Sequence, residues 1–69
     1  YYNRGLVHLV QGRLAESLAD LTVTLRLNPE FTKAYASRAL CYDRLGRKAE
    51  AEADRAAAGQ LTQPAAVGA

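Results

Sequence analysis

Leucines recur at helical spacing between residues 14 and 27. Leu14, Leu18, Leu21 and Leu25 follow one another at intervals of four, three and four residues. Because an α-helix has 3.6 residues per turn, these four side chains fall on one stripe. The spacing predicts an amphipathic helix over 14–27 that packs through its leucine face.

The chain repeats itself with a period of 34 residues. When residues 1–27 are laid over residues 35–61 without a gap, 10 of the 27 aligned positions are identical. The identical pairs are Tyr1/Tyr35, Arg4/Arg38, Leu6/Leu40, Gly12/Gly46, Arg13/Arg47, Ala15/Ala49, Glu16/Glu50, Ala19/Ala53, Asp20/Asp54 and Leu27/Leu61. A fixed period in this range indicates stacked copies of one supersecondary unit.

Turn residues divide each copy into two helices. Gly12 and Gly46 stand where a helix ends most easily on a left-handed residue, a conformation that glycine adopts without strain. Asn28-Pro29 ends the second helix, because the residue before proline avoids helical geometry. Thr32 is the predicted N-cap of the third helix. We expect helices near 1–11, 14–27, 32–45 and 48–61, with links so short that consecutive helices are antiparallel neighbours.

The second copy lacks the leucine stripe of the first. The equivalent positions hold Lys48, Glu52, Arg55 and Gly59, so we expect this face of the last helix to meet water. A terminal repeat needs a polar outer face to stay soluble, which predicts that the stack ends here. Residues 62–69 have small side chains and no period, which predicts a flexible tail.

Composition excludes several classes of protein. With 69 residues the chain forms at most one small domain of thin stability margin. Nine Lys and Arg and seven Asp and Glu are scattered along it, which argues against a nucleic-acid surface. The one cysteine, Cys41, excludes a disulfide-built scaffold and fits a reducing compartment such as the cytoplasm. No apolar run is long enough for membrane insertion.

The repeat resembles the tetratricopeptide repeat, whose signature is W-x2-L-G-x2-Y, then A-x3-F, then a late proline, in 34 residues. The matching residues of the first copy are Tyr1, Gly5, Ser17, Leu21 and Pro29. Those of the second copy are Tyr35, Ala39, Tyr42 and Ala51. The departures are His8 in place of a tyrosine, Arg55 in place of an aromatic residue, and Pro64, which arrives one residue late.

The resemblance implies an all-α fold, a right-handed superhelical stack of antiparallel helical hairpins that forms an α-solenoid of four helices. Two units then divide residues 1–61: a first, N-terminally truncated repeat over 1–31 and a terminal, capping repeat over 32–61. Small residues let the two helices of each hairpin approach closely. These are Gly5 facing Ser17 in the first copy and Ala39 facing Ala51 in the second.

The resemblance also implies a groove for a partner, lined by the first helix of each hairpin. The residues it assigns to this groove are Tyr2, Asn3, Leu6, Leu9, Val10, Lys33, Ala36, Ser37, Leu40, Asp43 and Arg44. The family's carboxylate clamp for chaperone C-termini matches only in part, since Ser37 stands where that clamp needs an arginine. The first-copy groove is apolar, which indicates a contact site or a face covered by an upstream repeat or another subunit.

Two charged positions recur together in both copies. Arg4 with Asp20 and Arg38 with Asp54 predict an ion pair between the two helices of each hairpin, the alternative being solvated charges that contribute little. Neither reading involves catalysis.

Catalytic and cofactor chemistry find no support in the sequence. His8 and Cys41 are the only soft metal ligands, whereas a structural zinc needs four. A Cys-His pair would lack a third group to orient it, and no glycine cluster resembles a phosphate-binding loop. We expect no enzyme activity, no metal and no cofactor, and we interpret His8 and Cys41 as packing residues.

The sequence favours a protein-protein interaction scaffold, the C-terminal end of a tetratricopeptide array that binds a peptide or helix of a partner protein and no small-molecule substrate. Self-association, as a homo-oligomer or by exchange of hairpins, is the alternative. The chain lacks methionine and opens on Tyr1-Tyr2, so we expect a fragment of a longer protein. That leaves open a regulatory appendage of a larger enzyme.

Overall fold

The computed structural model describes residues 1–62 and contains four helices and no strand in that range. The helices are α1 (Tyr2–Val10), α2 (Leu14–Leu27), α3 (Thr32–Arg44) and α4 (Lys48–Thr62). Each boundary lies within one residue of its predicted place. Thr62 belongs to α4, and the rest of the predicted tail lies outside the described residues.

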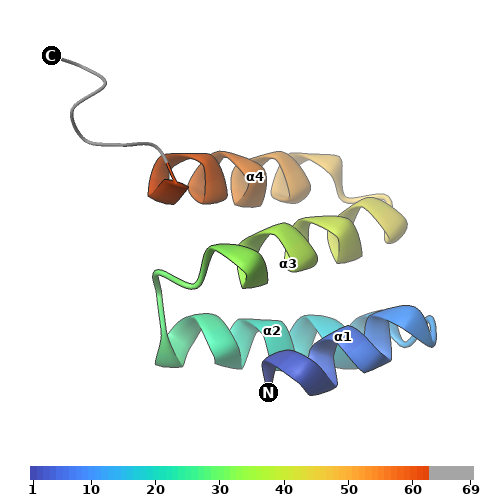
Figure 1. The fold of residues 1–69 in the computed structure, drawn as a ribbon. Coiled ribbons are helices and arrows are strands. Elements are labelled where there is room, and N and C mark those ends of the chain that lie inside the picture. The colour runs from blue at the N-terminus through green and yellow to red at the C-terminus, as the bar shows by residue number, and fades with distance from the viewer. Residues whose placement is uncertain (63–69) are drawn as a thin grey trace, which may run out of the picture.

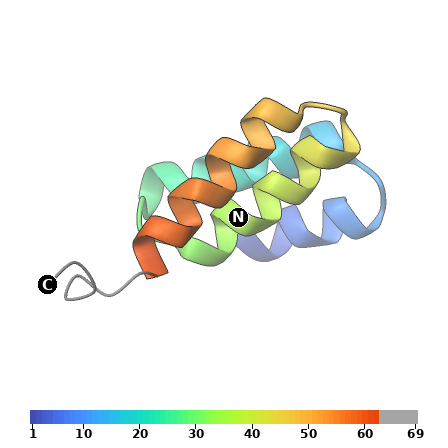
Figure 2. The same ribbon diagram turned by 90° about the horizontal axis from the view of Figure 1, so that it is seen from above.

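The four helices form two antiparallel pairs, one above the other (Figure 1). α1 and α3 run in one direction, and α2 and α4 run in the other. α3 packs against all three other helices. Viewed from above, α3 and α4 lie along the first pair (Figure 2). The all-helical fold and its antiparallel neighbours agree with the sequence analysis.

The same turn closes the first helix of each pair. Gly12 and Gly46 have φ of +79° and +78°. The amide of Arg13 donates to the carbonyl of His8, and the amide of Arg47 to that of Tyr42, both at 2.8 Å. This six-to-one hydrogen bond around a left-handed glycine satisfies carbonyls that the helix end would leave unpaired. The predicted helix ends are confirmed.

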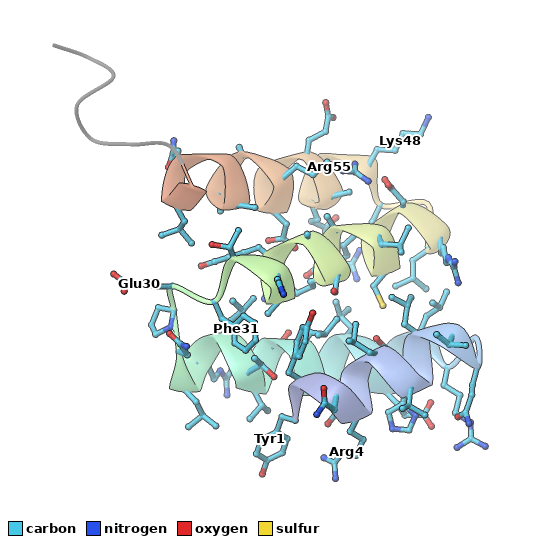
Figure 3. The ribbon with its side chains drawn as sticks, in the orientation of Figure 1. Tyr1, Arg4, Glu30, Phe31, Lys48 and Arg55 are labelled. Carbon is cyan, nitrogen blue, oxygen red and sulfur yellow. The ribbon has the colours of Figure 1, made fainter. Side chains whose placement is uncertain are left out.

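The predicted N-cap of α3 is wrong. Phe31 occupies the N-cap position without a side-chain capping bond, and Thr32 is the first helical residue. The hydroxyl of Thr32 donates instead to the carbonyl of Glu30 at 3.5 Å. Phe31, labelled in Figure 3, is held there by packing. Its ring lies 4.6 Å from that of Tyr2, and both rings lie against the core.

The core lies between the two helix pairs. Leu21, Leu25 and Ala34 form its buried centre, and Tyr2, Phe31 and Tyr35 cover it. Leu14 and Leu18, in the first half of the predicted leucine stripe, are only half-buried. The stripe therefore packs fully over the second half of α2, where α3 lies against it.

The predicted close approach of the two helices is confirmed in the first pair. A Cβ on Gly5 would lie 3.0 Å from Cγ of Leu21, and the hydroxyl of Ser17 donates to the Gly5 carbonyl at 2.7 Å. In the second pair Ala39 and Ala51 are completely buried. Small side chains at these places let the backbones meet.

The outer face of α4 is exposed, as its polar stripe predicted. Lys48, Glu52, Arg55 and Gly59 all lie on the surface, and the side chain of Lys48 points away from the other helices (Figure 3). Arg55 pairs with Asp43 of α3. The equivalent residues of the first copy, Leu21 and Leu9, are both buried.

Candidate functional site

A two-pronged ion pair joins the helices of each hairpin. Arg4 donates from Nε and Nη2 to Asp20 at 2.9 and 2.8 Å. Arg38 donates from the same two atoms to Asp54, both at 2.8 Å. Paired donation fits the planar guanidinium to the carboxylate. The predicted helix-to-helix pairs are confirmed, and they fix the register of each hairpin.

The two ion pairs differ in how well they are covered. The side chain of Arg38 is 19% exposed, whereas that of Arg4 is 62% exposed. Arg38 also donates from Nη1 to the hydroxyl of Thr22 on α2, at 3.4 Å. The first hairpin thus covers the second ion pair, while within residues 1–62 no hairpin covers the first.

Contacts with arginines shift the pKa values of Asp20, Asp43 and Arg38. Hydrogen bonds from Arg4 lower the pKa of Asp20, and the positive charge of Arg4 adds to this effect. The hydrogen bond to Asp54 raises the pKa of Arg38, and the one from Arg55 lowers the pKa of Asp43. A carboxylate stabilised in its charged form accepts protons poorly, so these groups serve to hold helices together.

His8 and Cys41 lie in different hairpins and are both largely enclosed. Nε2 of His8 is 3.6 Å from Oδ2 of Asp20, and its buried Nδ1 has no hydrogen-bond partner in the described part of the chain. Cys41 is fully buried, with Sγ 3.5 Å from the carbonyl of Leu14. Nowhere in residues 1–62 do three His, Cys, Asp or Glu side chains gather as metal ligands would.

Part of the predicted groove lies on the surface of α1 and α3. Its exposed residues are Asn3, Val10, Lys33, Ala36, Leu40 and Arg44, and its half-buried residues are Leu6 and Ser37. On α3, residues 33, 36, 37 and 40 follow helical spacing and share one stripe. Asn3 and Leu6 share a stripe on α1, which contacts α3. The structure therefore brings these six residues onto two neighbouring helices.

Four of the five remaining predicted groove residues have structural contacts. Leu9 is only 5% exposed, which corrects the expectation that it faces a ligand. The ring of Tyr2 packs on Phe31, and Asp43 is paired with Arg55. Of these three residues only Leu9 is buried, whereas Tyr2 and Asp43 are half-buried and engaged by neighbouring side chains. Arg44, although exposed, donates from Nη1 to the carbonyl of Leu9 at 3.4 Å.

One exposed apolar residue of α1 was not predicted from the sequence as part of a site. Val7 is 51% exposed and Val10 is 84% exposed. With Leu6 and Gln11 they line an open hollow. The available signal was the 34-residue equivalence of Val7 with Cys41, which lies at the contact between hairpins.

A second shallow hollow, formed by residues of α2, was also missed. It is lined by Ala15, Leu18, Ala19, Thr22, Val23 and Arg26. The signal in the sequence was the recurrence of two alanines, Ala15 and Ala19, 34 residues later. Helical periodicity alone did not distinguish this face from an ordinary solvent-facing one.

Comparison of the chain with family models, with curated proteins and with solved structures gave no match. Among the helices of residues 1–62, none combines the length and apolar character that a bilayer crossing requires.

Proposed function

We propose that the chain is a protein-interaction module of the tetratricopeptide type, forming the end of a right-handed superhelical stack. In this proposal a peptide or helix of a partner protein binds across α1 and α3, the first helices of the two hairpins. Support comes from the 34-residue period together with the matching turns and ion pairs of the two copies.

The unused side chains of α1 and α3 carry this proposal. Within residues 1–62, Asn3, Lys33 and Ser37 make no side-chain hydrogen bond or ion pair, although Asn3 and Ser37 directly precede the paired arginines Arg4 and Arg38. Leu40 leaves 41% of its surface exposed beside them. Polar groups free to bond around an exposed leucine suit recognition of a peptide, whose backbone supplies donors and acceptors.

A peptide-display selection tests the proposal with a matched pair of variants. The first variant, Ala36→Glu with Leu40→Glu, places two charges in the groove. The control, Ala53→Glu with Leu61→Glu, makes the same residue changes on α4, where Leu61 is also 41% exposed. Both variants change the net charge equally, and glutamate is a good helix former at all four positions.

The expected result is a family of peptides that bind the natural chain and the α4 control but bind the groove variant at least about tenfold more weakly, roughly the loss from one good interface anchor. Amide shifts on binding should concentrate at Asn3, Lys33 and Leu40. Equal binding to both variants, or a selection that enriches no peptide, contradicts the proposal.

A further inference from the structure

The exposed charges on the groove side of α3 are both positive. Lys33 lies in the first turn of α3 and Arg44 in its last turn, and both residues are exposed. Lys33 makes no side-chain hydrogen bond or ion pair within residues 1–62. Arg44 donates from Nη1 to the carbonyl of Leu9 at 3.4 Å, which holds its guanidinium beside the end of α1 but gives it no carboxylate partner. The groove therefore has an unpaired cation at each end of α3.

The acidic residues of the described chain are engaged elsewhere or lie on other surfaces. Four of them form ion pairs with arginines of their own hairpin, namely Asp20, Asp43, Asp54 and Glu50. Glu16 and Glu52 belong to α2 and α4, the second helices of the hairpins. Glu30, in the link before α3, points outward from the helices (Figure 3). Because complementary charges orient a partner at an interface, the groove suits a ligand that brings carboxylates to Lys33 and Arg44.

The surface between the two cations is neutral and partly apolar. Ala36, Ser37 and Leu40 share the stripe of Lys33 and Arg44, since these positions recur every three or four residues along α3. Leu40 stands seven residues after Lys33 and four residues before Arg44. At a rise of 1.5 Å per residue, the two cations are about 16 Å apart along the helix axis, and Leu40 lies about 10 Å from Lys33 and about 6 Å from Arg44.

This spacing fits a helical ligand better than an extended one. Residues seven and eleven positions apart lie on one stripe of an α-helix, and a partner helix has the same rise per residue as α3. One straight helix can therefore meet Lys33, Leu40 and Arg44 together. An extended peptide would cover the same distances in about three and about two residues. Because its side chains alternate between two faces, the residue that should meet Lys33 would point away from α3.

From this geometry we infer that the groove selects an amphipathic helix that carries two carboxylates eleven residues apart and an apolar side chain between them. The apolar side chain stands seven residues from the carboxylate that meets Lys33 and four residues from the carboxylate that meets Arg44. The inference rests on the proposed function and adds the chemistry of the partner to it. Recognition falls on side chains within the helix, so it differs from a clamp that holds the carboxylate at the end of a chain.

Synthetic helices test the inference by fluorescence anisotropy. Two short peptides of alanine and glutamine, capped at both ends, carry two glutamates eleven residues apart. A leucine stands seven residues after the first glutamate in one peptide and four residues after it in the other, one peptide for each direction along α3. A hydrocarbon staple on the opposite face keeps both peptides helical. The control peptide has the same composition, but its second glutamate is moved to the far side of the helix.

The expected result is that at least one of the two peptides binds the natural chain at least about fivefold more tightly than the control peptide. Lys33→Glu should weaken this binding about fivefold, because it replaces an attraction by a repulsion. A lysine in place of the peptide glutamate that meets Lys33 should restore the binding. The matched variant Lys48→Glu makes the same change in the first turn of α4, outside the groove, and should leave the binding unchanged.

Several results overturn the inference. These are no binding of either peptide, equal binding of the control peptide, and a Lys48→Glu effect as large as that of Lys33→Glu. Binding that survives a proline in the middle of the peptide, which breaks the helix, also overturns it, as does binding that needs a free carboxylate at the peptide end. The peptide-binding proposal still stands in each case if peptide display enriches ligands that the groove variant loses. If display enriches no peptide, both fall.

Discussion

Replacing Gly5 with alanine should destabilise the first hairpin, although alanine is the better helix former. Gly5 lies inside α1, where its carbonyl accepts from Ser17 and its Cα faces α2. An added Cβ would lie 3.0 Å from Cγ and 3.1 Å from Cδ2 of Leu21. Leu21 is fully buried, so it can move aside only by disturbing its own packing.

The magnitude follows from two opposed effects. Glycine to alanine inside a helix stabilises by about 1 kcal/mol, whereas forcing a methyl into a packed interior costs about 1–3 kcal/mol. The matched control is Gly59→Ala in α4, because a Cβ there meets no atom within 4 Å. The two variants should differ by about 2 kcal/mol in free energy of unfolding, the cost of the clash with Leu21.

Urea denaturation followed by helix circular dichroism measures this difference. Gly59→Ala should raise the midpoint and Gly5→Ala should lower it, with equal slopes if both variants keep the same cooperative unit. A Gly5→Ala chain as stable as the Gly59→Ala chain would refute the reasoning. It would mean that α1 and α2 separate easily, and that the tight contact at Gly5 does not limit the approach of the helices.

Three further predictions concern the ion pairs and the turns. Asp54→Asn should lower the free energy of unfolding by about 2 kcal/mol because Arg38 is covered and loses a charged acceptor; a change below about 0.5 kcal/mol in urea melts would contradict this. The folded state lowers the pKa of Asp20, so its stabilisation is present above the unfolded pKa of about 3.9 and is lost as pH falls through the lower folded value. Asp20→Asn should therefore lose less stability than the natural chain between pH 6 and about pH 2. If the free energy of unfolding falls in parallel with pH in the two chains, the lowered pKa of Asp20 is not the source of the pH dependence. Gly12→Ala should lower the free energy of unfolding by about 1 kcal/mol, since φ is +79° there. Gly12→Asn should melt at a temperature between those of Gly12→Ala and the natural chain, because asparagine tolerates that backbone better.

Most of the helix boundaries could be predicted because each has a local cause. Gly12 and Gly46 end helices through their own backbone freedom, and Pro29 restricts the residue before it. These effects depend on one or two residues and are visible in sequence. The N-cap of α3 could not be predicted in this way, since Phe31 is placed by its contact with Tyr2 on a distant helix.

The surface was harder to predict than the fold, because exposure depends on which neighbour lies across each helix. Leu9 and Val10 are adjacent in sequence and both apolar, yet one is 5% and the other 84% exposed. A stripe of apolar residues on α1 indicates that the helix makes a contact, but it does not show which apolar residues are buried and which stay exposed. The internal repeat could have shown this difference. Cys41 and Arg44, which lie 34 residues after Val7 and Val10, mark the positions where α3 meets the first hairpin.

Comparison of the two copies explains how a chain built of repeats can avoid associating end to end with further chains without limit. A head-to-tail contact joins two different surfaces of identical copies, and it extends into a filament unless the rotation between copies closes a ring. In this chain α1 keeps exposed apolar residues at Val7 and Val10, whereas the leucine stripe of α2 is replaced by charged residues and glycine in α4. The buried positions of Leu9 and Leu21 become the surface ion pair of Asp43 and Arg55. The two ends of the four-helix stack therefore differ in polarity, and burying the charges of α4 against Val7 and Val10 of another copy would be costly.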